Sequence, residues 1–140
     1  MNRKVLLTIT GFHSGEEADN GSVETVTEAE YFQRNGSHYL LYEEKDEDSR
    51  QTTKCRMKIK ENMVELTRQG LLNSNMIFEK GKSHTTSYQT PYGQMYLGIR
   101  TDEMSVQEGE REIRIEISYV LEADGEYLSD SRITISIKEQ

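Results

Sequence analysis

The sequence has little of several things on which other classes of protein depend. It contains no tryptophan, one proline and one cysteine in 140 residues. A single cysteine, Cys55, excludes a disulfide bond within the chain and fits a reducing compartment. No apolar run approaches the length of a transmembrane helix, and the apolar residues 5–7 are too few for the core of a signal peptide. We therefore expect a cytoplasmic protein that does not insert into a membrane.

The chain is acidic, with a net charge of −8 at pH 7. An acidic protein repels phosphate backbones and anionic headgroups, so we expect neither nucleic acid nor a membrane surface as a partner. Lys54, Arg56, Lys58 and Lys60 share one parity and would form a basic stripe on one face of a strand. Such a stripe suits either an anion-binding contact or a solvated face with acidic neighbours, and we favour the solvated face.

What the chain has in abundance is an alternation of apolar and polar residues. Ile113, Ile115 and Ile117 alternate with charged residues, and Ile133, Ile135 and Ile137 alternate with polar ones. A period of two is typical of a β-strand with one apolar and one solvated face. The low apolar content, 34%, agrees with strands that are each buried on one side only.

The same alternation predicts about ten short strands separated by turns. Besides the two isoleucine-rich runs, the predicted strands are 5–10, 23–32, 38–44, 52–60, 63–68, 75–79, 83–90 and 94–100. Asn35-Gly36 is typical of a tight hairpin turn, and residues 11–22 read as a long loop. The strongest helix candidate, residues 102–107, is weak.

Short links between consecutive strands predict an antiparallel meander, which can form a sandwich or a barrel. We favour a single domain over residues 1–140, closed into a barrel by pairing of the first and last strands, because closure leaves no exposed sheet edge. The last hairpin also has a predictable register. If residues 124–126 form a three-residue loop, Ala123 faces Tyr127 and the two isoleucine runs face each other.

No motif identifies a reaction, a metal or a cofactor. His13, His38 and His84 lack metal-ligand spacing, and Gly-rich phosphate loops and nucleophile motifs are absent. Cys55 shares the parity of apolar neighbours, which favours a buried, inert thiol over a nucleophile. We therefore assign no catalytic residue, no metal ligand and no cofactor.

The best ligand-binding candidates are polar groups on predicted strands. His84, Thr86, Tyr88 and Thr90 share one face of the strand 83–90. An inward face would give a polar wall in an apolar interior, whereas an outward face would carry ordinary strand formers; strand propensity slightly favours the outward orientation. His84, Tyr88 and Tyr119 are the candidate ligand contacts.

Four segments carry a resemblance to a known family: residues 42–44, 76–81, 90–93 and 121–125. They resemble the YwiB-like family of small bacterial proteins, and the resemblance extends over essentially the whole chain. It implies a lipocalin-like (calycin) antiparallel barrel of eight to ten strands, and it implies no ligand, reaction or catalytic residue. The Arg-x-Tyr carboxylate clamp of fatty-acid-binding proteins is missing, because Arg132 is followed by Ile133 and Thr134.

Three functions stay open at this point. The leading hypothesis is a barrel that binds a small, partly apolar ligand, since an eight-stranded barrel can enclose one. The alternative is a protein–protein interaction module with a packed, ligand-free interior, and a barrel enzyme is the third. The sequence does not determine the oligomeric state.

Overall fold

The computed structural model is all-β over the residues that it describes, namely 3–14, 22–45, 48, 50–70, 73–90 and 92–140. The backbone alone is described at residues 13, 14, 22 and 88–90. The ten strands are β1 (Arg3–Ser14), β2 (Ser22–Arg34), β3 (Ser37–Lys45), β4 (Thr52–Ile59), β5 (Met63–Gln69), β6 (Ser74–Glu79), β7 (Ser83–Thr90), β8 (Gly93–Glu108), β9 (Glu112–Ala123) and β10 (Glu126–Glu139). The loop expected over residues 11–22 is wrong at its ends, because residues 11–14 continue β1 and Ser22 begins β2. Residues 15–21 and Pro91 lie outside the described residues.

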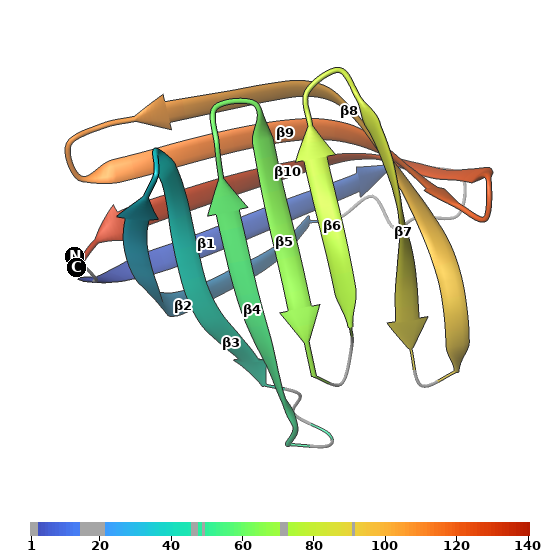
Figure 1. Cartoon of the computed structure of the whole chain (residues 1–140), viewed down its shortest axis with the longest axis horizontal. Helices are drawn as coiled ribbons and strands as arrows, with labels where there is room; N and C mark the ends of the chain where they lie inside the picture. The colour runs from blue at the N-terminus through green and yellow to red at the C-terminus, as the bar shows by residue number, and fades with distance from the viewer. Residues whose placement is uncertain (1–2, 15–21, 46–47, 49, 71–72, 91) are drawn as a thin grey trace.

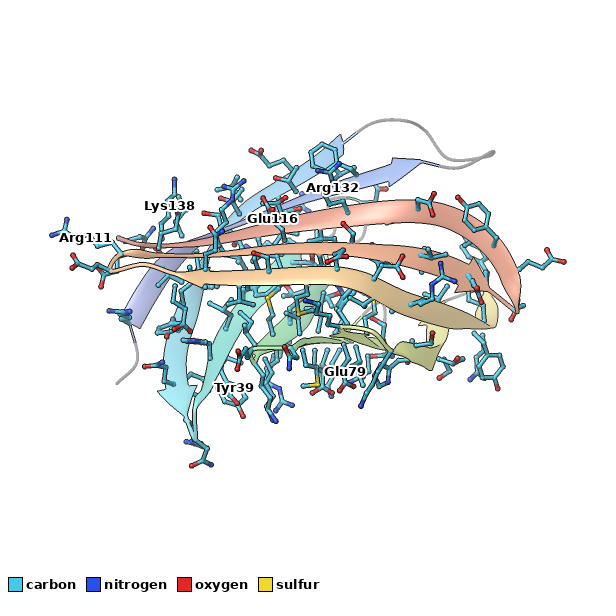
Figure 2. All side chains as sticks on the ribbon, turned by 90° about the horizontal axis from the view of Figure 1, so that it is seen from above. Tyr39, Glu79, Arg111, Glu116, Arg132 and Lys138 are labelled. Atoms are coloured by element: carbon cyan, nitrogen blue, oxygen red, sulfur yellow. The ribbon has the colours of Figure 1, made fainter. Side chains whose placement is uncertain are left out.

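All ten strands form one antiparallel sheet in the order β6-β5-β4-β3-β2-β1-β10-β9-β8-β7. The first and last strands pair along their length, from Val5 opposite Glu139 to Ser14 opposite Asp130, as expected for closure. The sheet curls so that β3–β7 cross over β1, β2 and β8–β10 (Figure 1), and side chains fill the space between these two sides (Figure 2). The predicted lipocalin-like barrel is confirmed.

The two ends of the sheet, β6 and β7, meet at a seam without a continuous ladder. A tight turn joins the two strands, and hydrogen bonds from Gly81 N to Thr101 O and from Thr101 N to Lys82 O tie that turn to β8. His84 Nε2 donates to Glu79 Oε1 across the seam at 2.9 Å. The barrel is therefore nearly closed, with side-chain and turn contacts at the seam.

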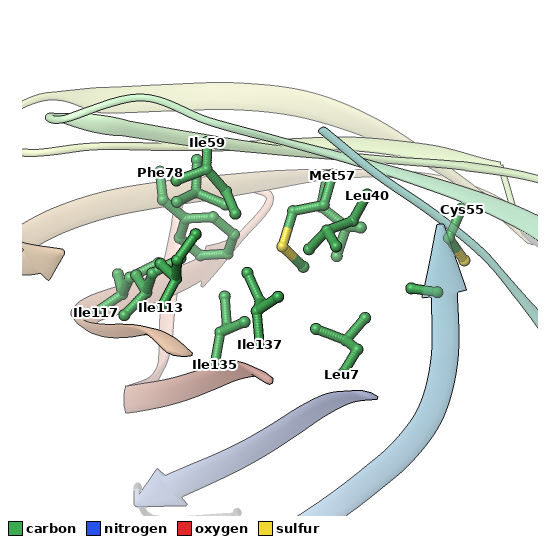
Figure 3. Packing of buried hydrophobic residues seen from close by; sticks show 14 of the residues in the cluster. Leu7, Leu40, Cys55, Met57, Ile59, Phe78, Ile113, Ile117, Ile135 and Ile137 are labelled. Carbon is green, nitrogen blue, oxygen red and sulfur yellow. The ribbon is translucent and has the colours of Figure 1, made fainter. Parts of the chain in front are cut away.

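The apolar side chains meet in one continuous core. Leu40, Met57, Ile59 and Phe78 reach inward from β3, β4 and β6 toward residues from β1, β9 and β10 (Figure 3). The opposing residues are Leu7, Ile113, Ile117, Ile135 and Ile137. Burial of a residue of this size contributes about 1.5–3 kcal/mol, so this core is the main stabilising element of the barrel.

The last hairpin has the predicted isoleucine register but a different turn. Ile117 faces Ile133 and Ile113 faces Ile137, as predicted. The three-residue loop is wrong, because Ala123 pairs with Glu126 and only Asp124-Gly125 forms the turn. Both turn residues have positive φ, which suits a two-residue hairpin. A bulge at Leu128 then shifts the pairing by one residue and restores the apolar face.

The weak helix candidate at residues 102–107 is wrong, because this segment is part of a strand that contains a second bulge. β8 continues through this segment, and its pairing with β9 shifts between Thr101 and Glu103. The extra residue, Asp102, lets Thr101 and Met104 both point inward although their parities differ. No helix long and apolar enough to cross a membrane occurs in the described part of the chain.

Deletion tests the role of the Leu128 bulge. Removing Leu128 leaves a regular two-residue hairpin with the isoleucine pairs intact, so we expect the variant to stay folded within about 1 kcal/mol of wild type. Removing Thr134 turns Ile135 and Ile137 outward, which should lower the free energy of unfolding by about 3–6 kcal/mol. Urea unfolding measures both, and equal destabilisation by the two deletions would contradict the register.

Candidate functional site

The inner face of the barrel can be followed from strand to strand, because directly paired residues point to the same side of a sheet. Across β3–β6, one inward row is apolar and consists of Leu40, Met57, Leu66 and Met76. The adjacent inward row toward one end of the barrel consists of Tyr42, Cys55, Arg68 and Ser74. We call these four residues the polar row.

Arg68 is the charged member of the polar row and is largely buried. Its Nε donates to Glu44 Oε1 at 3.1 Å, and the Cys55 thiol donates to the same carboxylate oxygen at 3.4 Å. Burial lowers the pKa of Arg68, but the nearby Glu44 and the Tyr42 and Cys55 side chains outweigh it, so that the net pKa is raised and the guanidinium stays charged.

Two hydroxyl groups of the polar row have no hydrogen-bond partner among the described residues. They are Tyr42 Oη and Ser74 Oγ, and both side chains are more than nine-tenths buried. Burial raises the pKa of Tyr42 far above its ordinary value, and the neighbouring Cys55 acts in the same direction. An unsatisfied buried hydroxyl costs about 1–3 kcal/mol, so each of these groups is a candidate to receive a polar partner.

Arg68 also lines a cavity of about 260 Å³ inside the barrel. The other lining residues are apolar except for the Tyr119 hydroxyl, and they come from both sides of the barrel: Ile9, Gly11, Val23, Met57, Val64, Leu66, Met76, Phe78, Ile117, Tyr119, Ile133 and Ile135. We call this space the lumen cavity. An apolar wall with a few placed polar groups is the usual composition of a small-molecule site.

Tyr119 is the sequence-predicted candidate that lies in the lumen cavity. Its ring contacts Phe78 edge to face, with 5.0 Å between centroids. Burial raises the pKa of Tyr119, while a hydrogen bond with Ser131 and the positive charge of Arg68 oppose that rise. The Arg68 charge therefore acts on Tyr119 from across the interior.

The strands β2 and β3 separate beyond a short paired segment. Their pairing ends at Glu30 opposite Leu41, and within the described residues the earlier part of β2 pairs only with β1. Val23 has inward parity and lines the lumen cavity, yet 69% of its surface is exposed. Tyr42 and Cys55 line the groove of about 560 Å³ that this β2–β3 split creates. The inward-facing Tyr42 and Cys55 are thus reached from the groove, and Val23 of the lumen cavity is exposed to solvent.

The opposite end of the barrel holds a chain of three polar side chains. His38 Nε2 contacts the Glu108 carboxylate, and His38 Nδ1 lies 2.6 Å from Tyr31 Oη. A carboxylate only accepts, so Nε2–H donates to Glu108, and in the neutral ring Nδ1 accepts from Tyr31. His38 and Tyr31 are buried and line a polar recess of about 190 Å³. The chain links β2 and β3 to β8 across this end.

Of the other two predicted ligand contacts, His84 lies outside the lumen cavity. His84 pairs with Ile99 and Thr86 with Leu97, and both partners are buried. The favoured outward orientation is therefore wrong for His84 and Thr86, which face inward beside the β6–β7 seam. His84 donates to Glu79; this bond, followed by that from Lys82, lowers the pKa of Glu79. The side chain of Tyr88 lies outside the described residues.

Sequence reasoning missed Arg68, although a usable signal was present. Arg68 has the parity of Val64 and Leu66, and Tyr42 has that of Leu40, so extension of the apolar alternation would have placed both inside. The basic stripe, by contrast, lies on the outer face, where Lys54 is opposite Glu43. Within the described residues, no group of three His, Cys, Asp or Glu side chains could hold a metal ion.

Alkaline pH tests the environment of Cys55. Burial raises the pKa of Cys55 from 9.0 to about 12, and Glu44 acts in the same direction. A thiol with a raised pKa in the folded protein contributes to stability at every pH below the pKa of the unfolded thiol. This contribution is lost as the pH rises from about 9 to about 12. We expect the free energy of unfolding of wild type to fall faster over this range than that of Cys55→Ala, by about 1.4 kcal/mol per pH unit. Parallel profiles would contradict the buried thiol.

A double-mutant cycle tests the contact between Tyr31 and His38. Tyr31→Phe and His38→Phe each remove one partner of the hydrogen bond, and we expect a coupling free energy of about 1 kcal/mol in urea unfolding. As a control, a cycle between Tyr31 and Arg114, which is exposed and pairs with Glu116, should give additive effects. Additive effects for the Tyr31–His38 pair would contradict the hydrogen bond.

Comparison with known proteins identifies the family. The family described as a domain of unknown function, DUF1934, matches residues 7–135. The structure is similar to the crystal structure of the ywiB protein from Bacillus subtilis, with a TM-score of 0.86, 22% sequence identity, and coverage of 99% of this chain and 93% of that one. At this identity the likeness shows the fold alone, and no curated protein matches the chain. The chain therefore belongs to the DUF1934 family, whose function is unknown, and it is YwiB-like in fold.

Proposed function

We propose that this protein is a cytoplasmic barrel that binds a small, partly apolar molecule in the lumen cavity. The observation that carries the proposal is a cavity of about 260 Å³ in an otherwise packed apolar core, with Arg68 and Tyr119 at its wall. The proposed cellular location is supported only by the free thiol of Cys55, which fits a reducing compartment.

The size of the cavity restricts the ligand. Sites for drug-sized molecules usually measure about 300–1,000 Å³, so 260 Å³ suits a smaller molecule. The apolar walls favour a hydrocarbon body, since each buried methylene group contributes about 0.8 kcal/mol. The β2–β3 split, with the inward-facing Val23 exposed at the cavity wall, supports access from solvent.

The cavity also distinguishes this function from the alternative interaction module. A module that works only through its surface has no use for an interior cavity, because a core with a cavity is less stable than a core packed with side chains. Ligand binding gives a reason for the space between Ile9, Met76 and Ile133.

The experiment compares two substitutions on the same strand. Val23→Trp should obstruct the lumen cavity, whereas Val26→Trp lies on the outer face of β2, where Val26 is 54% exposed. Thermal unfolding is measured with straight-chain alcohols, acids and amines of six to ten carbons. We expect at least one compound, at ten times its Kd, to raise the Tm of wild type and Val26→Trp by about 3–6 °C and to leave Val23→Trp unchanged.

Two outcomes would contradict the proposal. The first is that no compound of the panel shifts the Tm of wild type. The second is an equal shift in Val23→Trp and wild type, because binding would then occur outside the lumen cavity. Native mass spectrometry of the protein purified from its own host provides a second measurement, in which the proposal predicts a bound mass that Val23→Trp lacks.

A further inference from the structure

Among the described residues, three buried hydroxyl groups have no hydrogen-bond partner, and two of them, Tyr42 Oη and Ser74 Oγ, belong to the polar row; the third is Thr101 Oγ1 on β8. The four members of the polar row come from four neighbouring strands, so the barrel fold itself brings them together. We infer that the polar row recognises the anionic head group of a small amphiphile whose apolar tail occupies the lumen cavity. This inference rests on the proposed function and adds the chemical class of the ligand.

The charge of Arg68 selects an anion. Arg68 is both a member of the polar row and part of the wall of the lumen cavity, so it joins the polar and apolar regions. Its Nε–H to Glu44 uses one of the five donors of the guanidinium group. Planar guanidinium groups bind carboxylates through two parallel hydrogen bonds, and these are stronger than bonds between neutral groups. A cationic head group would be repelled at the same place.

The unpartnered hydroxyls supply further donors. Tyr42 Oη and Ser74 Oγ flank the Cys55–Arg68 pair on either side, are buried, and have no hydrogen-bond partner among the described residues. A tyrosine hydroxyl is protonated at neutral pH, and burial raises the pKa of Tyr42 further, so this group can donate. Two donors without partners among the described residues, beside a largely buried cation, form a site that an anion would complete.

Glu44 has a defined role in this arrangement. It neutralises Arg68 from the rim of the barrel, where its side chain is more exposed than that of Arg68. An incoming carboxylate shares Arg68 with Glu44, and repulsion between the two carboxylates weakens binding. Removal of the Glu44 charge should therefore strengthen the binding of the anion, an effect opposite in sign to removal of Arg68.

The test uses a pair of probes that differ only in the head group, octanoate and octan-1-ol, in isothermal titration calorimetry of the full chain at pH 7.5. Wild type should bind octanoate at least tenfold more tightly than octan-1-ol. Arg68→Met should weaken octanoate binding at least tenfold and change octan-1-ol binding less than threefold. Glu44→Gln should tighten octanoate binding several-fold. Arg114→Met, which removes an exposed arginine, should change neither.

A second variant keeps the test decisive if Arg68→Met does not fold. Tyr42→Phe removes only a hydroxyl group that has no partner in the described part of the chain, so the variant should be at least as stable as wild type. It should nevertheless bind octanoate about fivefold more weakly and octan-1-ol unchanged. Equal affinities of wild type for the two probes would overturn this inference but not the proposed function. The same holds if the preference for octanoate survives both Arg68→Met and Tyr42→Phe. Failure of both probes to bind would overturn the inference, and failure of the whole Tm panel would overturn the proposed function as well.

Discussion

The antiparallel ladder between β1 and β10 is the constraint on which the rest of the structure depends. It joins the two ends of the chain, which are far apart in sequence, and thereby turns a meander of hairpins into a barrel with an inside and an outside. Once the inside exists, every second residue of each strand is buried by the period of the strand itself. The isoleucine-rich core, the polar row and the lumen cavity all follow from that closure.

Closure also explains why polar groups are found inside. In β3–β6, the inward row that contains Leu40 and Met57 is apolar, and the adjacent inward row toward one end of the barrel is the polar row. At the opposite end, His38 is buried against Tyr31 and Glu108. Both ends thus bury polar side chains, but they treat them differently. The His38 chain finds its partners within the protein, whereas Tyr42 and Ser74 find none among the described residues. That difference is the physical basis for placing a ligand at one end and a structural contact at the other.

Much of the fold could be predicted because alternation is a local property. Ten strands, the hairpin at Asn35-Gly36 and the isoleucine pairing of β9 with β10 agree with the structure. Two of the errors occur where a bulge changes parity: Leu128 permitted a shorter turn than expected, and Asp102 lies in the β8 segment that was considered for a helix. A third, the orientation of His84 and Thr86, was decided by the pairing of β7 with β8. Of the candidate site residues, Tyr119 lies in the cavity wall and His84 lies beside the seam. Arg68 was missed because a single arginine at the end of a strand reads as a solvated residue.

The sequence by itself determined that this chain forms antiparallel strands and which residues share a face of each strand, because the two-residue period is set by the geometry of a single strand. Only the tertiary structure decided that the ends of the sheet meet at a seam between β6 and β7, where the β2–β3 split opens, and that Arg68 shares the interior with Tyr42 and Tyr119. Those relations join residues from separate strands. They depend on the curvature and pairing of the whole sheet, which no segment of the sequence specifies alone.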